Sequence, residues 1–217
     1  MASEANPSPS IIIRSFQASD LAQCQALFSA GHMSYGNAKI YIDHAMRKDI
    51  SDIDKNYMQV TNGHWWVAVS TEDNRIIGQI AILPLKIGDP SFYKTMSDDE
   101  CDQTCELIRL VVAPDAQRLG IGKKLISTLF EFARERGFNQ VHLTTLTSMD
   151  KACAFYERNG FVKGHIEKYS RNDVKVDSSE CVILDPNATI PEEDQRQMKM
   201  QLDKAAFLYV QHYFRKL

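Results

Sequence analysis

Short apolar, β-branched runs alternate along the chain with stretches whose apolar residues recur every three or four positions. Side chains of a strand alternate between two faces, whereas those of a helix return to one face after 3.6 residues, so this pattern predicts strands and helices in one mixed α/β domain. The runs that predict strands are residues 11–14, 65–69, 76–85, 106–112 and 140–146, with a last strand opening at Gly160-Phe161. The stretches that predict helices are residues 21–30, one or two helices within 37–60, residues 125–136 and residues 150–158.

Turn-forming residues separate these elements. Ser19 or Asp20 can cap the helix that follows, because a short side-chain oxygen satisfies the free amides of a first turn. Gly31 and Gly137 come directly after predicted helices, where glycine accepts the left-handed backbone of a helix end. The polar stretch 71–75 predicts that the strands on either side of it form a hairpin.

The two ends of the chain differ in character from the middle. Residues 1–10 are small and polar, which predicts a disordered tail before a domain that spans residues 11–187. Residues 188–217 predict a C-terminal helix appended to that domain, with Pro191 in its first turn. The apolar positions of its buried stripe are Leu202, Ala205, Ala206, Tyr209 and Tyr213. We expect this helix to dock on the domain or on a second copy of the chain, so a homodimer is one alternative.

The composition excludes several classes of protein. With 217 residues, 44% of them hydrophobic and 24% charged, the chain can build a core without disulfides. A net charge of −3 gives no basic excess for nucleic acid or an anionic membrane surface. No apolar stretch is long enough to span a bilayer, and the N-terminus lacks a signal-peptide pattern. We therefore expect a cytoplasmic protein, with the nucleus as the alternative, and no nucleic acid or membrane partner.

Cysteine and histidine positions do not predict a metal site. The five cysteines are irregularly spaced, and Cys101 and Cys105 have no second pair or nearby histidines, so free thiols in a reducing compartment are expected. Five histidines are isolated along the chain and are interpreted as structural: His32, His44, His64, His142 and His165.

The most informative segment joins an apolar strand to a helix through a turn that contains two glycines. After residues 107–114 the chain reads Gln117-Arg118-Leu119-Gly120-Ile121-Gly122-Lys123-Lys124. The first amides of a helix have no partner within it and lie at the positive end of its dipole, so this turn favours a bound phosphate. Gly120 and Gly122 remove side chains where a pyrophosphate must approach the backbone, and the basic residues add positive charge.

Two other phosphate-binding motifs do not fit this segment. A P-loop requires glycine where the chain has Gln117, and serine or threonine where it has Lys124. A dinucleotide-binding fingerprint that starts at Gly120 requires glycine where the chain has Leu125.

The segment resembles the acetyl-CoA motif of the GNAT acetyltransferases, Gln/Arg-x-x-Gly-x-Gly/Ala, which runs here from Gln117 to Gly122. A second motif of that family, Ala-x-x-x-Tyr-x-x-x-Gly-Phe, is matched by residues 152–161. The resemblance covers about residues 11–170. One position departs from the pattern, because the Asn often found three residues before the alanine is Met149 here. That difference puts one contact to the cofactor in doubt, not the fold.

The resemblance implies a specific fold and cofactor site. The GNAT fold has a central mixed sheet that splays at the acetyl-CoA cleft, with helices on both faces. Acetyl-CoA would lie between residues 106–112 and 140–146, with its pyrophosphate on the glycine turn. The residues expected to bind it are Leu110, Val111, Val112, Gln117, Arg118, Leu119, Gly120, Ile121, Gly122 and Lys123.

The resemblance also implies an N-acetyltransferase in which a primary amine attacks the thioester directly. Tyr156 would be the general acid that protonates the leaving sulfur, and the alternative is a tyrosine packed between helix and sheet. Glu106 would be the general base, because a lysine-like ammonium with a pKa of about 10.4 is almost wholly charged at neutral pH. The alternative for Glu106 is a carboxylate that faces solvent at a strand end. His142 follows as the next candidate base, because alternate residues of its strand face the cleft.

The acceptor is not named by the sequence. We expect a small-molecule amine, and the alternatives are a protein lysine or N-terminus, or a non-catalytic module that binds acetyl-CoA. The acceptor site would be lined by residues 34–60 and by the polar loop 88–104. An acidic cluster in that loop could steer a cationic amine or could simply face solvent: Asp98, Asp99, Glu100 and Asp102.

Residues 12–36, 64–69 and 147–149 resemble the camello-like branch of the GNAT acetyltransferases. Members of that branch carry a membrane segment after the first helix, where this chain has the polar stretch 38–57. A membrane location therefore does not carry over to this chain.

Overall fold

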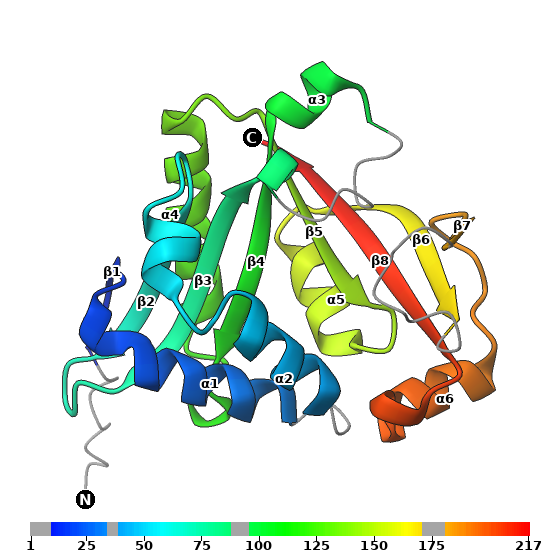
Figure 1. Ribbon diagram of the computed structural model, residues 1–217, viewed down its shortest axis with the longest axis horizontal. Helices are drawn as coiled ribbons and strands as arrows, with labels where there is room; N and C mark the ends of the chain where they lie inside the picture. Colours follow the sequence, from blue (N-terminus) through cyan, green and yellow to red (C-terminus); the bar gives the residue numbers. More distant parts are fainter. Residues whose placement is uncertain (1–9, 34–38, 88–95, 171–180) are drawn as a thin grey trace, which may run out of the picture.

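The computed structural model describes residues 10–33, 39–87, 96–170 and 181–217. Within these residues the strands form one eight-stranded sheet in the order β1-β2-β3-β4-β5-β8-β6-β7 (Figure 1). The strands are β1 Ile11–Ser15, β2 His64–Ser70, β3 Ile76–Pro84, β4 Thr104–Val112, β5 Gln140–Leu146, β6 Val162–Ser170, β7 Val182–Leu184 and β8 Phe207–Lys216. The helices are α1 Leu21–Met33, α2 Lys39–Lys48, α3 Asp98–Asp102, α4 Ile121–Glu135, α5 Asp150–Arg158 and α6 Glu192–Met200. Apart from Ser10, the predicted disordered tail 1–10 lies outside the described residues.

The sheet is mixed and has helices on both faces. β4 and β5 run parallel, whereas the other neighbouring strands that the structure describes run antiparallel. A Cβ atom added to Gly31 of α1 would lie 2.5 Å from Val111, and one added to Gly78 of β3 would lie 2.8 Å from Ile121 of α4. Val111 pairs with Gln79, the neighbour of Gly78 along β3, so α1 and α4 cover opposite faces. This is the fold class that the sequence predicted.

Several helix bounds differ from the predicted ones. α1 continues past Gly31, because this glycine permits close packing on β4 and does not end the helix. α4 begins at Ile121, directly after Gly120, and not at Leu125. Part of the predicted loop 88–104 forms α3, which begins with a capping box of Ser97 and Glu100. Residues 88–95 of that loop lie outside the described residues.

The prediction of one helix over residues 188–217 is wrong for its second half. The helix ends at Met200, and residues 207–216 form β8, which lies between β5 and β6 in the sheet. Residues 207–216 contain four aromatic residues and the β-branched Val210, which favour a strand, and Tyr209, Gln211 and Tyr213 lie buried on one of its faces. The spacing of Tyr209 and Tyr213 fits a helix face and also fits one face of a strand. β8 therefore completes the central sheet and is not an appendage.

The part of the segment before β8 packs on the same sheet. Met198 of α6 and Leu202 belong to a small buried cluster with Ile166 of β6 and Tyr209 of β8. The Tyr209 hydroxyl donates a hydrogen bond of 2.7 Å to Asp194 of α6. The expected docking on the domain is thus observed, through α6 and β8 together.

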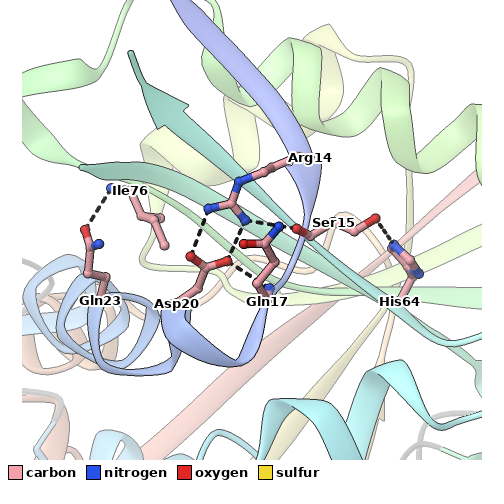
Figure 2. Close-up of polar contacts among 7 residues, drawn as sticks. All are labelled: Arg14, Ser15, Gln17, Asp20, Gln23, His64 and Ile76. Carbon is pink, nitrogen blue, oxygen red and sulfur yellow. Dashed lines mark hydrogen bonds and ion pairs between the residues drawn. The ribbon is translucent and has the colours of Figure 1, made fainter. Parts of the chain in front are cut away.

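Side-chain contacts connect the edge strand β1 to the turn before α1, and connect α1 to β3 (Figure 2). Arg14 donates hydrogen bonds of 2.6 and 2.9 Å to the two carboxylate oxygens of Asp20. Asp20 also accepts a hydrogen bond of 2.9 Å from the backbone amide of Gln17. Asp20 is itself part of the turn before α1, and this hydrogen bond closes that turn. Gln23 of α1 accepts the Ile76 amide at 3.0 Å and connects the helix to the start of β3.

Candidate active site

β4 and β5 separate after a short paired stretch. They are hydrogen-bonded neighbours from Thr104 to Glu106 and from Gln140 to His142. Beyond this point β4 continues along β3 while β5 continues along β8, and the two strands diverge toward the lower part of Figure 1. The divergence leaves backbone groups on the facing edges of β4 and β5 available for a ligand. This is the splayed sheet that the sequence predicted.

A β-bulge lies in β4 beside this opening. Gln79 pairs with Val111 and Ala81 pairs with Ile108, so Arg109 and Leu110 together oppose one residue of β3. Arg109 has a φ of 58°, a conformation that costs a non-glycine residue about 1–2 kcal/mol. A bulge changes the direction of neighbouring backbone groups, here at the position expected to contact the acetyl group.

The side chain of Arg109 holds the bulge in place. Its guanidinium donates hydrogen bonds of 2.9 and 2.7 Å to Asp49 after α2 and one of 2.8 Å to the Tyr41 hydroxyl. The same group lies 5.2 Å from the centre of the Phe28 ring of α1. Burial alone would lower the pKa of Arg109, but Tyr41, Tyr57 and Asp49 more than reverse this and raise it. Arg109 was not predicted as a site residue, because neither its partners nor the bulge can be recognised from spacing.

The glycine turn lies between β4 and α4. Arg118 and Gly120 have φ values of 70° and 75°, and Gly120 directly precedes the first residue of α4. A Cβ atom added to Gly120 would meet nothing within 4 Å, so space for a ligand remains on this side of the turn. Gly122 has a different surrounding, because a Cβ atom there would lie 3.0 Å from the Phe155 ring of α5. The turn thus combines an open position with close packing of α4 on α5.

The other residues expected to bind the cofactor lie along this turn and strand. Gln117, Arg118, Leu119 and Lys123 are exposed, whereas Ile121 is buried and serves the core with its side chain. Gln117 Nε2 lies 3.5 Å from the carbonyl oxygen of Val112 at the end of β4. Leu110 and Val112 are half-buried, and Val111 is buried under α1. A groove of about 570 Å³ also begins at Gly120, but it runs along α4 toward β1, away from the opening.

Glu106 is buried where β4 and β5 separate. It is 4% exposed and pairs laterally with His142 of β5, which is fully buried. Glu106 also pairs with Leu83, which shares a face of β3 with Gln79, so the Glu106 side chain lies on the α1 side of the sheet. The alternative of a solvent-facing carboxylate is therefore wrong.

Tyr156 lies within a group of aromatic rings on α5. It is 8% exposed, and its ring centre lies 5.7 Å from that of Phe161 and 6.1 Å from that of Tyr213 on β8. The ring is thus packed between helix and sheet, as the alternative interpretation supposed. Packing of the ring does not decide what the hydroxyl does.

Met149 precedes α5, and its sulfur accepts a hydrogen bond of 3.5 Å from Thr145 of β5.

Three histidines that are far apart in the sequence form a cluster with one carboxylate, which two of them contact directly. His142 Nε2 lies 3.0 Å from His212 Nδ1, and His212 Nε2 lies 3.2 Å from Glu167. His165 Nε2 lies 3.7 Å from the other oxygen of Glu167. Burial lowers the pKa of His142 well below its usual range, and the neighbouring His212 adds to this effect. Burial alone would raise the pKa of Glu167, but hydrogen bonds from the two adjacent histidines and from Tyr169 hold it low.

The sequence could not show this cluster. Its members lie on β5, β6 and β8, and β8 was predicted as part of a helix. His142 and His165 are therefore not isolated residues. His212 was not considered in the sequence analysis at all.

The acidic residues of α3 lie away from the opening. α3 precedes β4 at the end where β4 and β5 are still paired (Figure 1). Asp102 forms an ion pair of 2.7 Å with Lys86, and Glu100 closes the capping box of its own helix. These contacts favour the interpretation of a solvated acidic segment.

Comparison with known proteins identifies the family. The model of the Acetyltransferase (GNAT) family matches residues 33–161, which contain both motifs, the bulge and the opening. The chain belongs to the GNAT family. Among solved structures, a GNAT acetyltransferase from Staphylococcus aureus has a TM-score of 0.62 at 19% identity, covering 96% of this chain and 99% of that chain. At this identity the similarity concerns the fold alone.

Curated relatives belong to the camello and N-acetyltransferase 8 group. Camello of Xenopus tropicalis, an N-acetyltransferase by name, is 39% identical over 56% of this GNAT chain and 49% of its own. Human N-acetyltransferase 8 is 33% identical over 57% of this chain and 49% of its own. The chain spans about half the length of the curated relatives it matches. None of the helices in the described ranges combines the length and the apolar character that a bilayer crossing requires.

Proposed function

We propose that this GNAT chain transfers an acetyl group from acetyl-CoA to a primary amine. The observation that carries the proposal is the arrangement around β4. The strand leaves β5 after Glu106, contains a bulge at Arg109 and Leu110, and ends at the open glycine turn of α4. Backbone donors and acceptors therefore line an opening that leads to a phosphate-binding helix start.

The residues present fit acetyl-CoA, which supplies the thioester. The first amides of α4, at Ile121, Gly122 and Lys123, have no carbonyl partner within the helix and suit a pyrophosphate. Arg118 and Lys123 are exposed and add positive charge at the same place. The edge of β4 from Leu110 to Val112 would hold the pantetheine arm and the acetyl carbonyl by backbone hydrogen bonds.

Acid–base chemistry is assigned to Glu106 and Tyr156. The Glu106 carboxylate would accept a proton from the acceptor ammonium, directly or through water, on the α1 side of the sheet. The Tyr156 hydroxyl would donate a proton to the sulfur that leaves. Glu106 is at the last paired position of β4 and β5, directly before the two strands separate. Tyr156 lies on α5, the helix that packs against the glycine turn.

A small-molecule amine is the acceptor we propose. Glu106 and His142 are recessed in the sheet, which favours a slender group that can enter beside Arg109. A lysine side chain or a peptide N-terminus is also slender, so a protein substrate is the second candidate. Asp49 and Arg109 compensate each other's charge, and Arg109 also donates a hydrogen bond to the neutral Tyr41 hydroxyl, so this pair presents no net charge to an acceptor.

Turnover with different acceptors tests the proposal. CoA release is measured with acetyl-CoA and three sets of acceptors: small primary amines, lysine-containing peptides with blocked N-termini, and peptides with free N-termini. Turnover of the first set alone supports the small-molecule proposal, and turnover of the peptides replaces it with the protein proposal. Acetyl-CoA binding without any turnover would leave the chain a binding module, and no binding would overturn the cofactor site.

A further inference from the structure

A second group of chemically active side chains lies between β6 and β8, outside the opening between β4 and β5. His165 and Glu167 are two residues apart on β6 and face one side of the sheet, and His212 comes from the neighbouring strand β8. One ligand atom from each of these residues lies within 4.8 Å of the others. Glu167 and His212 are buried, at 1% and 0% exposure. We call these three residues the β6–β8 triad.

No ion pair with a Lys or Arg side chain reaches the buried carboxylate of Glu167 within the described residues. Among the described residues, its ion pairs are with the two imidazoles of the β6–β8 triad. Lys168, its neighbour along β6, lies over the Phe207 and Tyr209 rings instead, with its ammonium 3.9 Å from the first ring centre. A buried carboxylate is costly unless a positive charge compensates it. A cation held by the same imidazoles would supply that charge.

The two printed distances from the Glu167 carboxylate to the imidazoles are close to the ligand spacing of a metal site. Bonds of about 2.1 Å in a tetrahedral site place neighbouring ligand atoms about 3.4 Å apart. The separations from Glu167 oxygens to His212 Nε2 and His165 Nε2 are 3.2 and 3.7 Å. The imidazole rings of His165 and His212 are stacked at 4.0 Å, so His165, the more exposed of the two, must turn its ring to bind.

Neighbouring residues orient the ligands as outer-shell partners do. His142 Nε2 lies against His212 Nδ1, which leaves His212 Nε2 toward Glu167. Tyr169 donates a hydrogen bond to the Glu167 carboxylate. Such contacts fix ring orientation and tautomer at metal centres. We propose that the β6–β8 triad binds one divalent transition-metal ion, with Zn²⁺ the best match to two imidazoles and a carboxylate.

Cobalt and zinc titrations test this site without an activity assay. Chelator-treated protein is titrated with Co²⁺ under a visible spectrum and with Zn²⁺ in a calorimeter. We expect one ion per chain, the absorption bands of a four-coordinate Co²⁺ site, and a higher Tm with Zn²⁺ because the ion binds only the folded state. The matched control is the His64→Asn variant. His64 lies on β2, away from the triad, and forms a hydrogen bond with Ser15 of β1. This variant should bind both ions like the wild type.

Variants of the ligands decide the outcome. His165→Ala should weaken Zn²⁺ binding more than about 100-fold, since loss of an outer-shell partner alone costs 10–100-fold. Glu167→Gln should do the same, and if it fails to fold, the less buried His165 still provides the test. Absence of Co²⁺ bands and of Zn²⁺ heat in the folded wild type would overturn the proposal. Binding that survives His165→Ala unchanged would also overturn it.

Discussion

Arg109, at the bulge of β4, forms two hydrogen bonds with Asp49, which directly follows α2. Their side chains are 13% and 15% exposed, and the N–O separation of the ion pair is 2.7 Å. Tyr57 also donates a hydrogen bond to Asp49. The pair therefore connects the proposed acceptor side of the opening, built from α1 and α2, to the strand expected to hold the acetyl group.

Replacing Arg109 should destabilise the fold and loosen the bulge. Arg109→Met leaves a largely buried carboxylate without its cation, so the free energy of unfolding should fall by about 3 kcal/mol. We expect kcat/KM for the acceptor to fall more than acetyl-CoA affinity does. Urea unfolding and steady-state kinetics measure the two effects. The control is Arg75→Ala, which breaks the exposed Arg75–Asp115 pair of 2.7 Å and should change little. Equal stability of Arg109→Met and wild type would contradict the role of the pair.

A glycine substitution tests the phosphate-binding turn. Gly120→Asp places a negative charge in the open space before α4, so acetyl-CoA affinity should fall by at least about 100-fold, as expected from loss of several charge-assisted hydrogen bonds. Gly137→Asp is the matched control. Gly137 also has a positive φ and open space, but it lies after the far end of α4. Calorimetry should show that the control variant binds acetyl-CoA like the wild type. Equal acetyl-CoA affinity of the two variants would contradict a phosphate site at this turn.

Asp20 should contribute a pH-dependent part of the stability. Burial alone raises the pKa of Asp20, but hydrogen bonds from Arg14 and the Gln17 amide more than reverse this and lower it (Figure 2). The lowered pKa means that the folded state favours the carboxylate. The stabilisation is therefore complete above the unfolded pKa of about 3.9 and is lost as pH falls through the folded value.

Thermal unfolding of Asp20→Asn checks this sign. The variant should lose about 1.5 kcal/mol at neutral pH, the lower end of what a hydrogen bond to a charged group contributes, and the deficit should shrink below about pH 4. Asp43→Asn is the control, because Asp43 forms an exposed i,i+4 pair with Lys39. A deficit that grows toward acidic pH would contradict the assignment.

Removal of β8 should abolish folding. A chain that ends at Asp185 lacks the strand between β5 and β6, so it exposes two sheet edges and much of the Tyr209 and Tyr213 environment. We expect loss of the cooperative thermal transition, whereas an appended helix would cost only a few degrees. Circular dichroism on the truncated chain measures this, and a sharp transition would show that β8 is dispensable.

Local sequence signals predicted the elements whose pattern is complete within a few residues. The apolar runs of β2 and β3 are nearly continuous because both faces of these strands are covered. The glycine turn was recognised because two glycines between an apolar strand and a helical pattern form a signal within a few residues. β8 was missed because its spacing of tyrosines fits two periods, and only its pairing with β5 and β6 decides between them.

The residues of the candidate site also fall into two groups, those that local sequence signals predict and those that they do not. Glu106 and Tyr156 could be proposed from motifs, since each lies at a fixed distance from a recognisable signal. The Arg109–Asp49 pair and the β6–β8 triad could not, because their members come from separate strands and helices. Such contacts depend on strand order and register, which spacing along one chain does not contain.

The division of labour between Glu106 and Tyr156 follows from where protons must go. An amine must lose a proton before it attacks, whereas a thiol with a pKa of about 8.5 leaves fairly well as a thiolate. The base should therefore matter more than the acid for a lysine-like acceptor. General acid–base groups contribute about 10²–10⁴-fold, so we expect Glu106→Gln to lower kcat at neutral pH by at least about 100-fold, and Tyr156→Phe by less.

The pH profile separates this role of Glu106 from a structural one. Solution supplies the neutral amine as pH approaches the acceptor pKa of about 10.4, so the Glu106→Gln deficit should shrink between about pH 6.5 and 9.5. The measurement is kcat at saturating acetyl-CoA for both variants and the wild type. Circular dichroism confirms that Glu106→Gln, a buried substitution beside His142, is folded. A pH profile of kcat for Glu106→Gln that runs parallel to the wild-type profile, at a near-normal rate, would exclude Glu106 as the general base. His142, its lateral partner on β5, would then be tested next by His142→Asn.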